Sequence, residues 1–579
     1  MNKLVRINTK TNEVKVEEVP EELRSLGGRG LTSRIIRQEV DPICHPLGPG
    51  NKLVIAPGIL TGTPAPNTGR ISVGGKSPLT GGIKESNSGG TFAQKMAKLG
   101  LQALILEDKP EQKSAPKVIY VNKDGIKVEE MPELANLGTY ASSEKLFAKY
   151  GNKVGILVIG PAGENLRLNS SIQFTDPKGR PARAAGRGGL GAVMGSKGVK
   201  AIVVDDQGAS GVSFADKDEF KATTKRWTEI LRSHPVTSQG LPSFGTAILI
   251  NIINEAGALP TQNFRQGRFD KAAQVSGEKI AENIEKRGGV VKEGCHPGCI
   301  IQCSQAYVDE KGDYITSGFE YETVWAMGPN TLIDNLDDIA QLDRLCDDLG
   351  MDTIETGNTI AVAMEAGIVP WGDGKGAIEL LKRIYDPKDY LGKIIANGAA
   401  FTGEALGVDR VPVVKRQALP AYDPRSVKGV GVTYATTPMG ADHTAGYAVC
   451  QNVLKVGGCI NPLQKEGNVE VSKNLQIATA AIDSLGFCLF VAFAILDSQD
   501  ALDVVAKMLT AKTGKKWTVD DIINLGVEVL KDELSFNKDA GFTKAQDQLP
   551  EFFRKEPLPP HNTVWDFSIE ELQQAKVLA

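Results

Sequence analysis

The sequence predicts an α+β protein in which a β-rich N-terminal domain precedes two mainly α-helical domains. Short β-prone runs separated by clusters of Gly, Pro and Asn fill the chain as far as Val204. From Phe214 onward, apolar residues recur at intervals of three and four, which is typical of amphipathic helices. This change of period predicts where the β-rich part ends.

The β-rich part contains runs that are short, rich in Val and Ile, and bounded by turn residues. They predict strands over residues 3–8, 13–19, 52–55, 69–73, 103–107, 117–121, 154–159 and 200–204. Helices are predicted over 333–349 and 353–366, with Gly367 as a stop, and over about 376–400 and 470–512.

Two breaks in the pattern predict domain boundaries. The segment DQGASGV at 206–212 is composed like a linker, and a Pro-containing stretch covers 411–424. We therefore expect domains over 1–207, 208–412 and 413–579. The sequence shows no long tandem repeat and no low-complexity tract.

Composition excludes several classes of protein. The 66 basic and 70 acidic residues give a formal net charge of −4, which excludes a strongly basic nucleic-acid binder. A chain that is 41% apolar and 23% charged is not disordered. The longest apolar run, 487–496, is about half of the ~20 residues that a membrane span needs, and the N-terminus lacks the apolar core of a signal peptide. We expect a cytoplasmic protein without a membrane span.

Three of the eight cysteines lie close together, at Cys295, Cys299 and Cys303. In a reducing compartment such bunching indicates metal or redox chemistry, and three thiolates suit a soft metal centre. Structural zinc favours paired ligands, and the sequence has no CxxC pair, whereas an iron–sulfur cluster accepts a triplet plus a distant cysteine. The candidates for that fourth ligand are Cys44, Cys346, Cys450, Cys459 and Cys488.

Two other interpretations of the triplet stay open. The three thiols can simply be buried structural residues. The spacing is also one residue longer, in its second gap, than a radical-SAM triplet, which would require a βα barrel around it; instead, the triplet is expected within a helical region. His296 is expected to be solvated or to lie behind the ligands rather than to be a ligand itself.

Two turns share the frame D-x-L-G-x-(D/C), beginning at Asp347 and at Asp483. Each is expected to end one helix and begin another, with Gly350 and Gly486 at positive φ. The aspartates can accept hydrogen bonds from the amino and ring NH groups of a ligand, although two ordinary helix breaks would look the same. Two copies indicate a ligand bound twice with pseudo-symmetry, and the second copy makes Cys488 the best fourth cluster ligand.

Together these residues resemble the aldehyde:ferredoxin oxidoreductases, tungsten enzymes that carry a bis-pyranopterin cofactor. The resemblance runs essentially end to end. It rests on GGRGLTSRI at 27–35, the run from 56 to 92, RAAGRGGLGAVMGSKG at 183–198, the cysteine triplet, EYET at 320–323, both DxxG turns and GADHT at 440–444.

The resemblance implies that the β-rich domain is a base on which a tungsten (or molybdenum) bis-pyranopterin lies, closed over by the helical domains. Arg70 would lie between cluster and pterin. The carbonyls of Asn87 and Ala185, with Ala184 as the rival, would hold a Mg²⁺ bridging the pterin phosphates. Further cofactor contacts are implied for Ser88, Gly89, Gly90, Arg183, Gly186, Arg187 and Gly188.

The same resemblance implies one pterin at each DxxG turn. Asp347, with Asp352 and Thr353, would hold the first, and Asp483, with Phe487, the second. Cys295, Cys299, Cys303 and Cys488 would bind one [4Fe–4S] cluster. For catalysis, His443 is the expected proton shuttle, Glu322 or its neighbour Glu320 the matching carboxylate, with the spacing to Asp347 favouring Glu322, and Tyr422 a tyrosine near the metal.

Two features depart from the family pattern. The triplet has three and three intervening residues where familiar members have two and three. Some members hold a lone iron at a dimer axis through an E-x-x-H pair, but the pair Glu293/His296 overlaps the triplet, so we expect neither that iron nor that dimer mode. A homodimer of another kind or a hetero-oligomer stays possible.

The predicted function is oxidation of an aldehyde to a carboxylic acid with water as the oxygen source, electrons leaving through the cluster to ferredoxin. The alternative is the catalytic subunit of a larger electron-transfer complex with a separate Fe–S subunit, which would run acid reduction or act on another substrate. A non-enzymatic Fe–S protein is a distant third. The sequence does not identify the substrate; the EYET segment lacks the tungsten-ligating cysteine of ring-reducing relatives, which argues against ring reduction.

Overall fold

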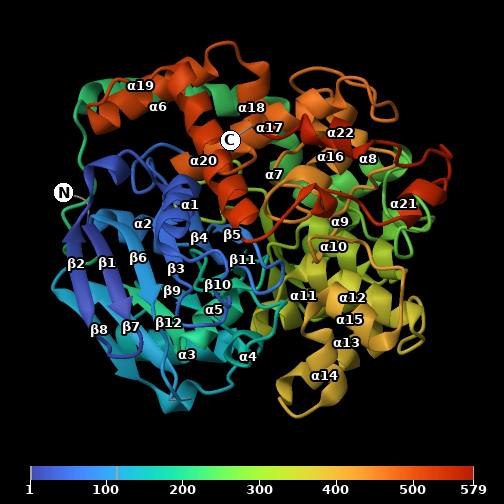
Figure 1. Ribbon diagram of the computed structural model, residues 1–579, viewed down its shortest axis with the longest axis horizontal. Helices are drawn as coiled ribbons and strands as arrows, with labels where there is room; N and C mark the ends of the chain where they lie inside the picture. Colours follow the sequence, from blue (N-terminus) through green and yellow to red (C-terminus); the bar gives the residue numbers. More distant parts are fainter. Residues whose placement is uncertain (1–2, 113–114, 578–579) are drawn as a thin grey trace.

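The computed structural model describes residues 3–112 and 115–577, and it begins with a six-stranded sheet (Figure 1). The strands of this sheet follow the order β2-β1-β6-β3-β4-β5, in which β1 and β6 are parallel and the other neighbours antiparallel. Their bounds are β1 (Lys3–Asn8), β2 (Val14–Glu18), β3 (Leu53–Pro57), β4 (Ile71–Lys76), β5 (Ile83–Ser88) and β6 (Leu101–Glu107).

A second six-stranded sheet repeats this topology strand for strand, in the order β11-β10-β9-β12-β7-β8, with β7 and β12 as its parallel pair. Its strands are β7 (Lys117–Asn122), β8 (Gly125–Glu130), β9 (Gly155–Val158), β10 (Ile172–Phe174), β11 (Arg183–Ala185) and β12 (Val199–Val204). The prediction of a β-rich N-terminal part is confirmed. The structure also shows an internal repeat of the sheet topology, which no tandem repeat in the sequence indicates.

The two sheets pack face to face around an apolar layer that includes Ile55, Val73, Leu157 and Phe174. Helix α1 (Gly28–Glu39) and the end of α20 (Val519–Asp539) cover the outer face of the first sheet. Helix α3 (Thr139–Tyr150) covers the outer face of the second. The edge strands β5 and β11 lie against each other, so the two sheets present one shared edge to the helical part.

The helical part shares one continuous hydrophobic core that includes residues on both sides of position 412. The three-domain division at 207 and 412 therefore stays a prediction. The principal helices are α6 (Lys217–Ser233), α8 (Leu249–Glu255), α9 (Gly277–Arg287), α10 (Tyr321–Met327), α11 (Leu336–Leu349), α12 (Thr353–Glu365), α13 (Gly374–Lys382), α14 (Tyr390–Ile395), α15 (Gly398–Leu406), α16 (Lys428–Thr436), α17 (Asn468–Leu485), α18 (Val491–Asp497) and α19 (Ala501–Thr513).

The predicted helices over 333–349 and 353–366 are present as α11 and α12, whereas the long stretches 376–400 and 470–512 each divide into several shorter helices. Within residues 3–112 and 115–577, no single helix is long and apolar enough to cross a bilayer. The helical segments Val236–Phe244 and Thr246–Glu255 meet that test only as a pair, and they are bent by 91°.

The cysteine triplet does not lie in a helical region, and that expectation is wrong. It occupies the loop between β13 (Val290–Glu293) and β14 (Ser304–Val308), which form a small antiparallel sheet with β15 (Tyr314–Ser317). Strands this short give little periodic signal, because their pairing partners rather than their own sequence hold them extended. Because a loop has no fixed helical period, it can direct three thiols toward one centre.

Each DxxG turn docks on the same position of one sheet repeat. Gly486 and Gly350 both adopt the left-handed conformation, with φ of 90° and 69°, as predicted. Gly58, directly after β3, packs so closely that a Cβ there would lie 2.1 Å from the Cα of Gly486. Gly160, after β9, would place its Cβ 2.2 Å from the carbonyl oxygen of Leu349. The two DxxG turns therefore pack against equivalent positions of the two sheets, after β3 and after β9.

We expect Gly58→Ala to destabilise the protein by about 1–3 kcal/mol, because the added methyl group has no room and the turn at Gly486 must move. The matched control is Gly240→Ala, where φ is −62° and the nearest atom to the new Cβ lies 3.7 Å away. Chemical unfolding of both variants measures the difference. Equal midpoints for the two variants would contradict the close docking.

Candidate functional site

A large cavity lies where the shared edge of the two sheets meets the helical part, with an empty volume of about 1760 Å³ that includes its open mouth. It gathers most of the site residues that the sequence predicted. Those that line it are Arg70, Asn87, Ser88, Gly89, Arg183, Ala184, Gly186, Arg187, Cys295, Cys303, Glu320, Glu322, Asp347, Asp352, Thr353, Tyr422, His443, Asp483 and Cys488.

Other predicted residues lie behind this lining. Those that do not face the cavity are Gly90, Ala185, Gly188, Cys299, Gly350, Gly486 and Phe487. The methyl group of Ala185 lies in the core between the sheets, whereas its rival Ala184 is exposed to the cavity. The space beside Gly188 holds the aliphatic stem of Lys84, whose Cγ would lie 2.5 Å from an added Cβ. Gly188 thus makes room for the lysine stem, and the cofactor contact implied for it stays a prediction.

Arg70 lies between the cysteine triplet and the edge strand β5. Its Nη2 donates to the carbonyl oxygen of Asn87 at 3.2 Å, and its Nε donates to the side chain of Asn87. A Cβ on Gly89 would lie 3.1 Å from the Sγ of Cys295 and 3.3 Å from the Nη1 of Arg70. The absence of a side chain at Gly89 lets the guanidinium and the thiol approach each other.

The two arginines of the RAAGR segment differ in which of their guanidinium nitrogens have hydrogen-bond partners. Arg183 donates to the Oγ of Ser304 at 2.5 Å, and its Nε has no partner within the described residues; the buried Oγ of Ser88 is also unpaired there. Each nitrogen of the Arg187 guanidinium has a partner: the group donates to Asp352 at 3.0 Å and to the carbonyls of Ala441 at 2.6 Å and Ala418 at 2.7 Å. An anion at this edge would therefore find Arg183 available and Arg187 occupied.

A pair of carboxyl groups lies at each DxxG turn. Asp343 lines the cavity one helical turn before Asp347, and Glu85 lines it near Asp483. Burial raises the pKa of Asp483 to about 6 and that of Glu85 to about 8. Burial also raises the pKa of Asp343, to about 7, so each pair can offer both a donor and an acceptor near neutral pH. The sequence analysis missed Asp343 and Glu85; only the spacing of four residues from Asp347 could have pointed to the former.

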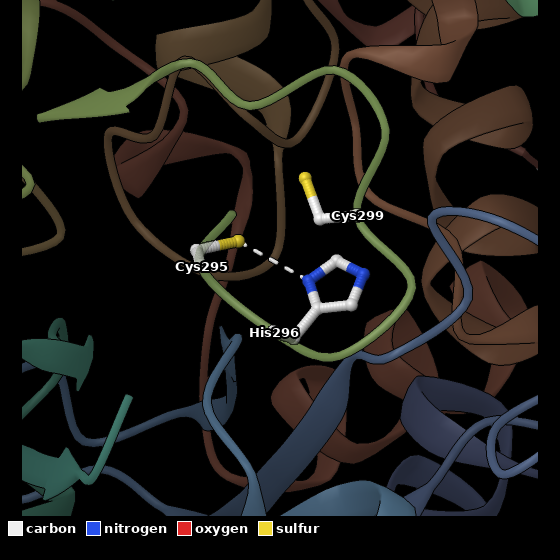
Figure 2. Close-up of side chains that lie close together, drawn as sticks. All are labelled: Cys295, His296 and Cys299. Carbon is white, nitrogen blue, oxygen red and sulfur yellow. Dashed lines mark hydrogen bonds between the residues drawn. The ribbon is translucent and has the colours of Figure 1, made fainter. Parts of the chain in front are cut away.

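The cysteine loop brings two thiols and a histidine together (Figure 2). The ligand atoms of Cys295, His296 and Cys299 all lie within 4.8 Å of one another, and the Sγ of Cys295 is 3.1 Å from the Nδ1 of His296. His296 is 2% exposed, so the expectation that it is solvated is wrong, although its contact with a cysteine fits a role behind the ligands. The hydrogen bond with Cys299 holds the pKa of Cys295 well below that of an ordinary thiol.

Asn67, which the sequence analysis missed, connects Cys488 to the triplet. The triplet and Cys488 together form the cysteine group. The side-chain amide of Asn67 donates to the Sγ of Cys299 at 3.5 Å, and its Oδ1 accepts from the backbone N–H of Ile300 at 3.1 Å. Its carbonyl accepts from the N–H of Cys488 at 2.8 Å. The residue has a φ of 62°, which asparagine tolerates better than most side chains. One residue of the N-terminal part therefore contacts both the triplet, through its side chain, and Cys488, through its backbone carbonyl.

His443 and Glu322 lie side by side in the lining of the cavity. The Nε2 of His443 lies 3.5 Å from the Oε1 of Glu322, whose Oε2 accepts from the N–H of Ala421 at 2.9 Å. Burial raises the pKa of Glu322 to about 8 and lowers that of His443 to about 4. Both side chains are thus neutral between these values, and the pair is a carboxylic acid beside an imidazole rather than a salt bridge.

The surroundings of this pair separate Glu322 from Glu320. Glu320 accepts from Thr246 at 2.6 Å and lies 3.8 Å from the Nη1 of Arg183, on the side of the cysteines. The Tyr422 ring is centred 6.3 Å from that of His443, and its hydroxyl lies 2.6 Å from that of Tyr447. The structure therefore places Glu322 beside the histidine, and it adds Tyr447, which carried no sequence signal.

Comparisons with known proteins cover almost the whole chain. Residues 4–206 match the family model "Aldehyde ferredoxin oxidoreductase, N-terminal domain", and residues 222–575 match "Aldehyde ferredoxin oxidoreductase, domains 2 & 3". Tungsten-containing aldehyde ferredoxin oxidoreductases of Pyrococcus furiosus and Thermococcus kodakarensis are 37% and 38% identical to this chain. Each match covers 96% of this chain and 92% of the relative.

Two more distant proteins share parts of this likeness. The WOR-like subunit of the aliphatic sulfonate oxidoreductase of Pyrococcus furiosus is 27% identical over 77% of this chain and 75% of its own length. The active site complex BamBC of benzoyl coenzyme A reductase, solved with 1,5 dienoyl-CoA, superposes with a TM-score of 0.81 at 18% identity, covering 99% of this chain and 93% of that one. This second likeness shows a common fold.

Proposed function

The chain belongs to the aldehyde ferredoxin oxidoreductase family, so it is an oxidoreductase, and we infer that it oxidises an aldehyde to a carboxylic acid. The reaction is R–CHO + H₂O → R–COO⁻ + 3H⁺ + 2e⁻, with the electrons leaving one at a time through a [4Fe–4S] cluster to ferredoxin. The observation that carries this proposal is the neutral pair of His443 and Glu322 inside a cavity that also reaches the cysteine group.

The residues present fit the cofactors of this family. Asp347 and Asp483 would accept hydrogen bonds from the amino edge of one pterin each. The unpaired Nε of Arg183 and Oγ of Ser88 would bind pterin phosphates, with Mg²⁺ held by the carbonyl of Asn87 and by that of Ala185 or Ala184. Cys295, Cys299, Cys303 and Cys488 would hold the cluster. When bound, a tungsten bis-pyranopterin supplies two-electron redox chemistry that no side chain offers.

The chain's own contribution is acid–base chemistry and orientation. Because burial lowers the pKa of His443 to about 4, its imidazole is neutral and can accept a proton from water at neutral pH. Because burial raises the pKa of Glu322 to about 8, its carboxyl is protonated and can donate a hydrogen bond to the aldehyde oxygen. Tyr422 and Tyr447 confine the substrate beside this pair.

The charge of the cavity favours an uncharged aldehyde. Among its described lining residues the cations are Arg29, Arg70, Arg183 and Arg187, which all come from the N-terminal domain. The wall beside His443 presents the rings of Tyr422 and Tyr447, and the nearby guanidinium of Arg187 is already bonded to Asp352 and to two backbone carbonyls. A phosphate or carboxylate on the substrate would enter this wall without a partner, which is costly in a buried site.

The test is metal analysis of anaerobically purified protein together with aldehyde-dependent viologen reduction. We expect one tungsten and about four irons per chain, the stoichiometry of a single four-cysteine cluster. Uncharged aldehydes should react faster than glyceraldehyde-3-phosphate or glyoxylate. Iron near eight per chain, or none, would overturn the single cluster, and inactivity toward every aldehyde would overturn the reaction.

A second candidate is the catalytic subunit of a larger electron-transfer complex, which would run acid reduction or act on another substrate. The likeness to a protein described as a WOR-like subunit favours it. In that case an Fe–S protein should co-purify stoichiometrically from the native source and accept electrons faster than free ferredoxin. Purification of the chain alone with full ferredoxin-linked activity would exclude this candidate.

A further inference from the structure

The loop that carries His443 depends on contacts from outside its own domain. It follows α16 and spans residues 437–446 without a regular strand or helix. Within it, the Oδ1 of Asp442 accepts hydrogen bonds from the N–H of Thr444 at 3.0 Å and from its hydroxyl at 2.7 Å. Asp442 therefore fixes the residue that directly follows the histidine.

The partner of Asp442 is a lysine of the N-terminal domain. The Nζ of Lys84, on the edge strand β5, lies 3.2 Å from the Oδ2 of Asp442. The Lys84 side chain is 1% exposed, and its stem runs through the space that Gly188 leaves open. Lys84 does not line the cavity, whereas Asp442 does. The lysine therefore contacts the lining of the site through the aspartate rather than by facing the cavity itself.

A second bond holds the same loop against the same domain. The carbonyl of Ala441, directly before Asp442, accepts from the Nη1 of Arg187 at 2.6 Å and from the side-chain amide of Gln417 at 2.7 Å. Arg187 also binds Asp352 of the first DxxG turn. Cations from β5 and from the turn after β11 thus meet on two successive residues of the histidine loop.

We propose that Lys84 is a positioning residue for His443: its buried ammonium group holds Asp442, and through Asp442 it fixes both the place and the charge environment of the imidazole. The Oδ1 of Asp442 lies 3.9 Å from the Nδ1 of His443, which has no hydrogen-bond partner within the described residues. The proposal rests on the assignment of His443 as the proton acceptor.

The charges around His443 decide the direction of the expected effect. Glu322 faces it from α10, Asp442 from its own loop, and the phenols of Tyr422 and Tyr447 lie beside it; Arg187 and Lys84 supply positive charge. Burial lowers the pKa of His443, Asp442 opposes this, and the two cations add to it. Removing Lys84 leaves Asp442 uncompensated, so the histidine should bind a proton more readily.

Four proteins test the proposal: wild type, Lys84→Met, Asp442→Asn and the double variant. The measurement is the pKa of His443 by NMR of ¹³C-labelled histidine in the cofactor-loaded enzyme, where the resonance absent from His443→Asn identifies the residue among five histidines. We expect Lys84→Met to raise this pKa by about one unit and Asp442→Asn to lower it. The double variant should return close to wild type, because it leaves no buried charge unpaired.

Activity gives a second readout on the same proteins. Lys84→Met should lower kcat by ~10- to 100-fold and move the acidic limb of the kcat profile to higher pH, since the imidazole is then protonated at higher pH. The double variant should recover most of the activity, and it also covers the case in which Lys84→Met alone folds poorly.

The outcomes separate this proposal from the proposed function. An unchanged His443 pKa in all variants, with normal tungsten and iron content, would overturn the role of Lys84 and leave aldehyde oxidation intact. A wild type inactive toward aldehydes would overturn the function, while the NMR titration, which needs no substrate, would still decide the role of Lys84. Equal loss of activity in the single and double variants without a pH shift would indicate that the lysine only stabilises the fold.

Discussion

His443→Asn is expected to reduce aldehyde oxidation by ~100- to 10,000-fold while tungsten and iron content stay at wild-type levels. Asparagine keeps a polar group of similar reach but cannot accept a proton. His443 contacts neither the cysteine group nor the DxxG aspartates within hydrogen-bond distance in the described structure, so the cofactor should remain bound. Metal analysis and viologen-linked assays on the same preparation measure both quantities.

The pH profile of the wild-type enzyme tests the same assignment. His443, with a pKa lowered by burial to about 4, is a competent base only above that value. Glu322, with a pKa raised by burial to about 8, is a hydrogen-bond donor only below that value. Activity should therefore fall as pH drops through about 4 and as it rises through about 8.

Glu322→Gln is the matched control, because glutamine still donates a hydrogen bond but cannot ionise. We expect it to remove the alkaline limb and keep the acidic one. Near-normal turnover in His443→Asn, or an alkaline limb that survives in Glu322→Gln, would refute the roles given to these two residues.

Cys488→Ala is expected to lower iron from about four to three or fewer atoms per chain and to abolish electron transfer from aldehyde to ferredoxin. The reason is geometric: Cys488 follows the second DxxG turn directly, and its N–H donates to the carbonyl of Asn67, whose side-chain amide donates to the Sγ of Cys299. No neighbouring thiol from its own segment can replace it, because the next cysteines along the chain are far from position 488.

Cys459→Ala is the control for this prediction, since Cys459 is exposed and lies outside the cysteine group. It should keep full iron content and activity. Electron paramagnetic resonance of the dithionite-reduced proteins distinguishes an intact cluster from a three-iron remnant. A Cys488→Ala protein with four irons would show that another residue, such as His296 beside Cys295, completes the cluster.

The sequence alone determined the features that depend on neighbours along the chain. The two DxxG glycines were predicted at positive φ, and the structure has them there, because a helix that must reverse needs a residue without a Cβ penalty. The helices α11 and α12 followed from their apolar period. The end-to-end order of motifs identified the family, which the comparisons confirm.

Tertiary structure alone decided the features that join distant segments. Strand β5, with the sequence IKESNS, has no apolar alternation and is extended only because it pairs with β4 and lies at the edge shared with β11. The triplet loop belongs to a small sheet for the same reason. The repeat of the two sheets is visible in their strand order and not in their residues.

The chemistry of the site divides in the same way. Residue type and spacing were enough to nominate the cysteine triplet, because bunched thiolates are suited to metal binding, whereas His443 and Glu322 were nominated through the resemblance to the family. Their pKa values, the ion pair of Lys84 with Asp442 and the engagement of Arg187 depend on burial and on contacts between segments hundreds of positions apart. Desolvation and charge pairing exist only once the chain has closed around them, and no local pattern in the sequence records them.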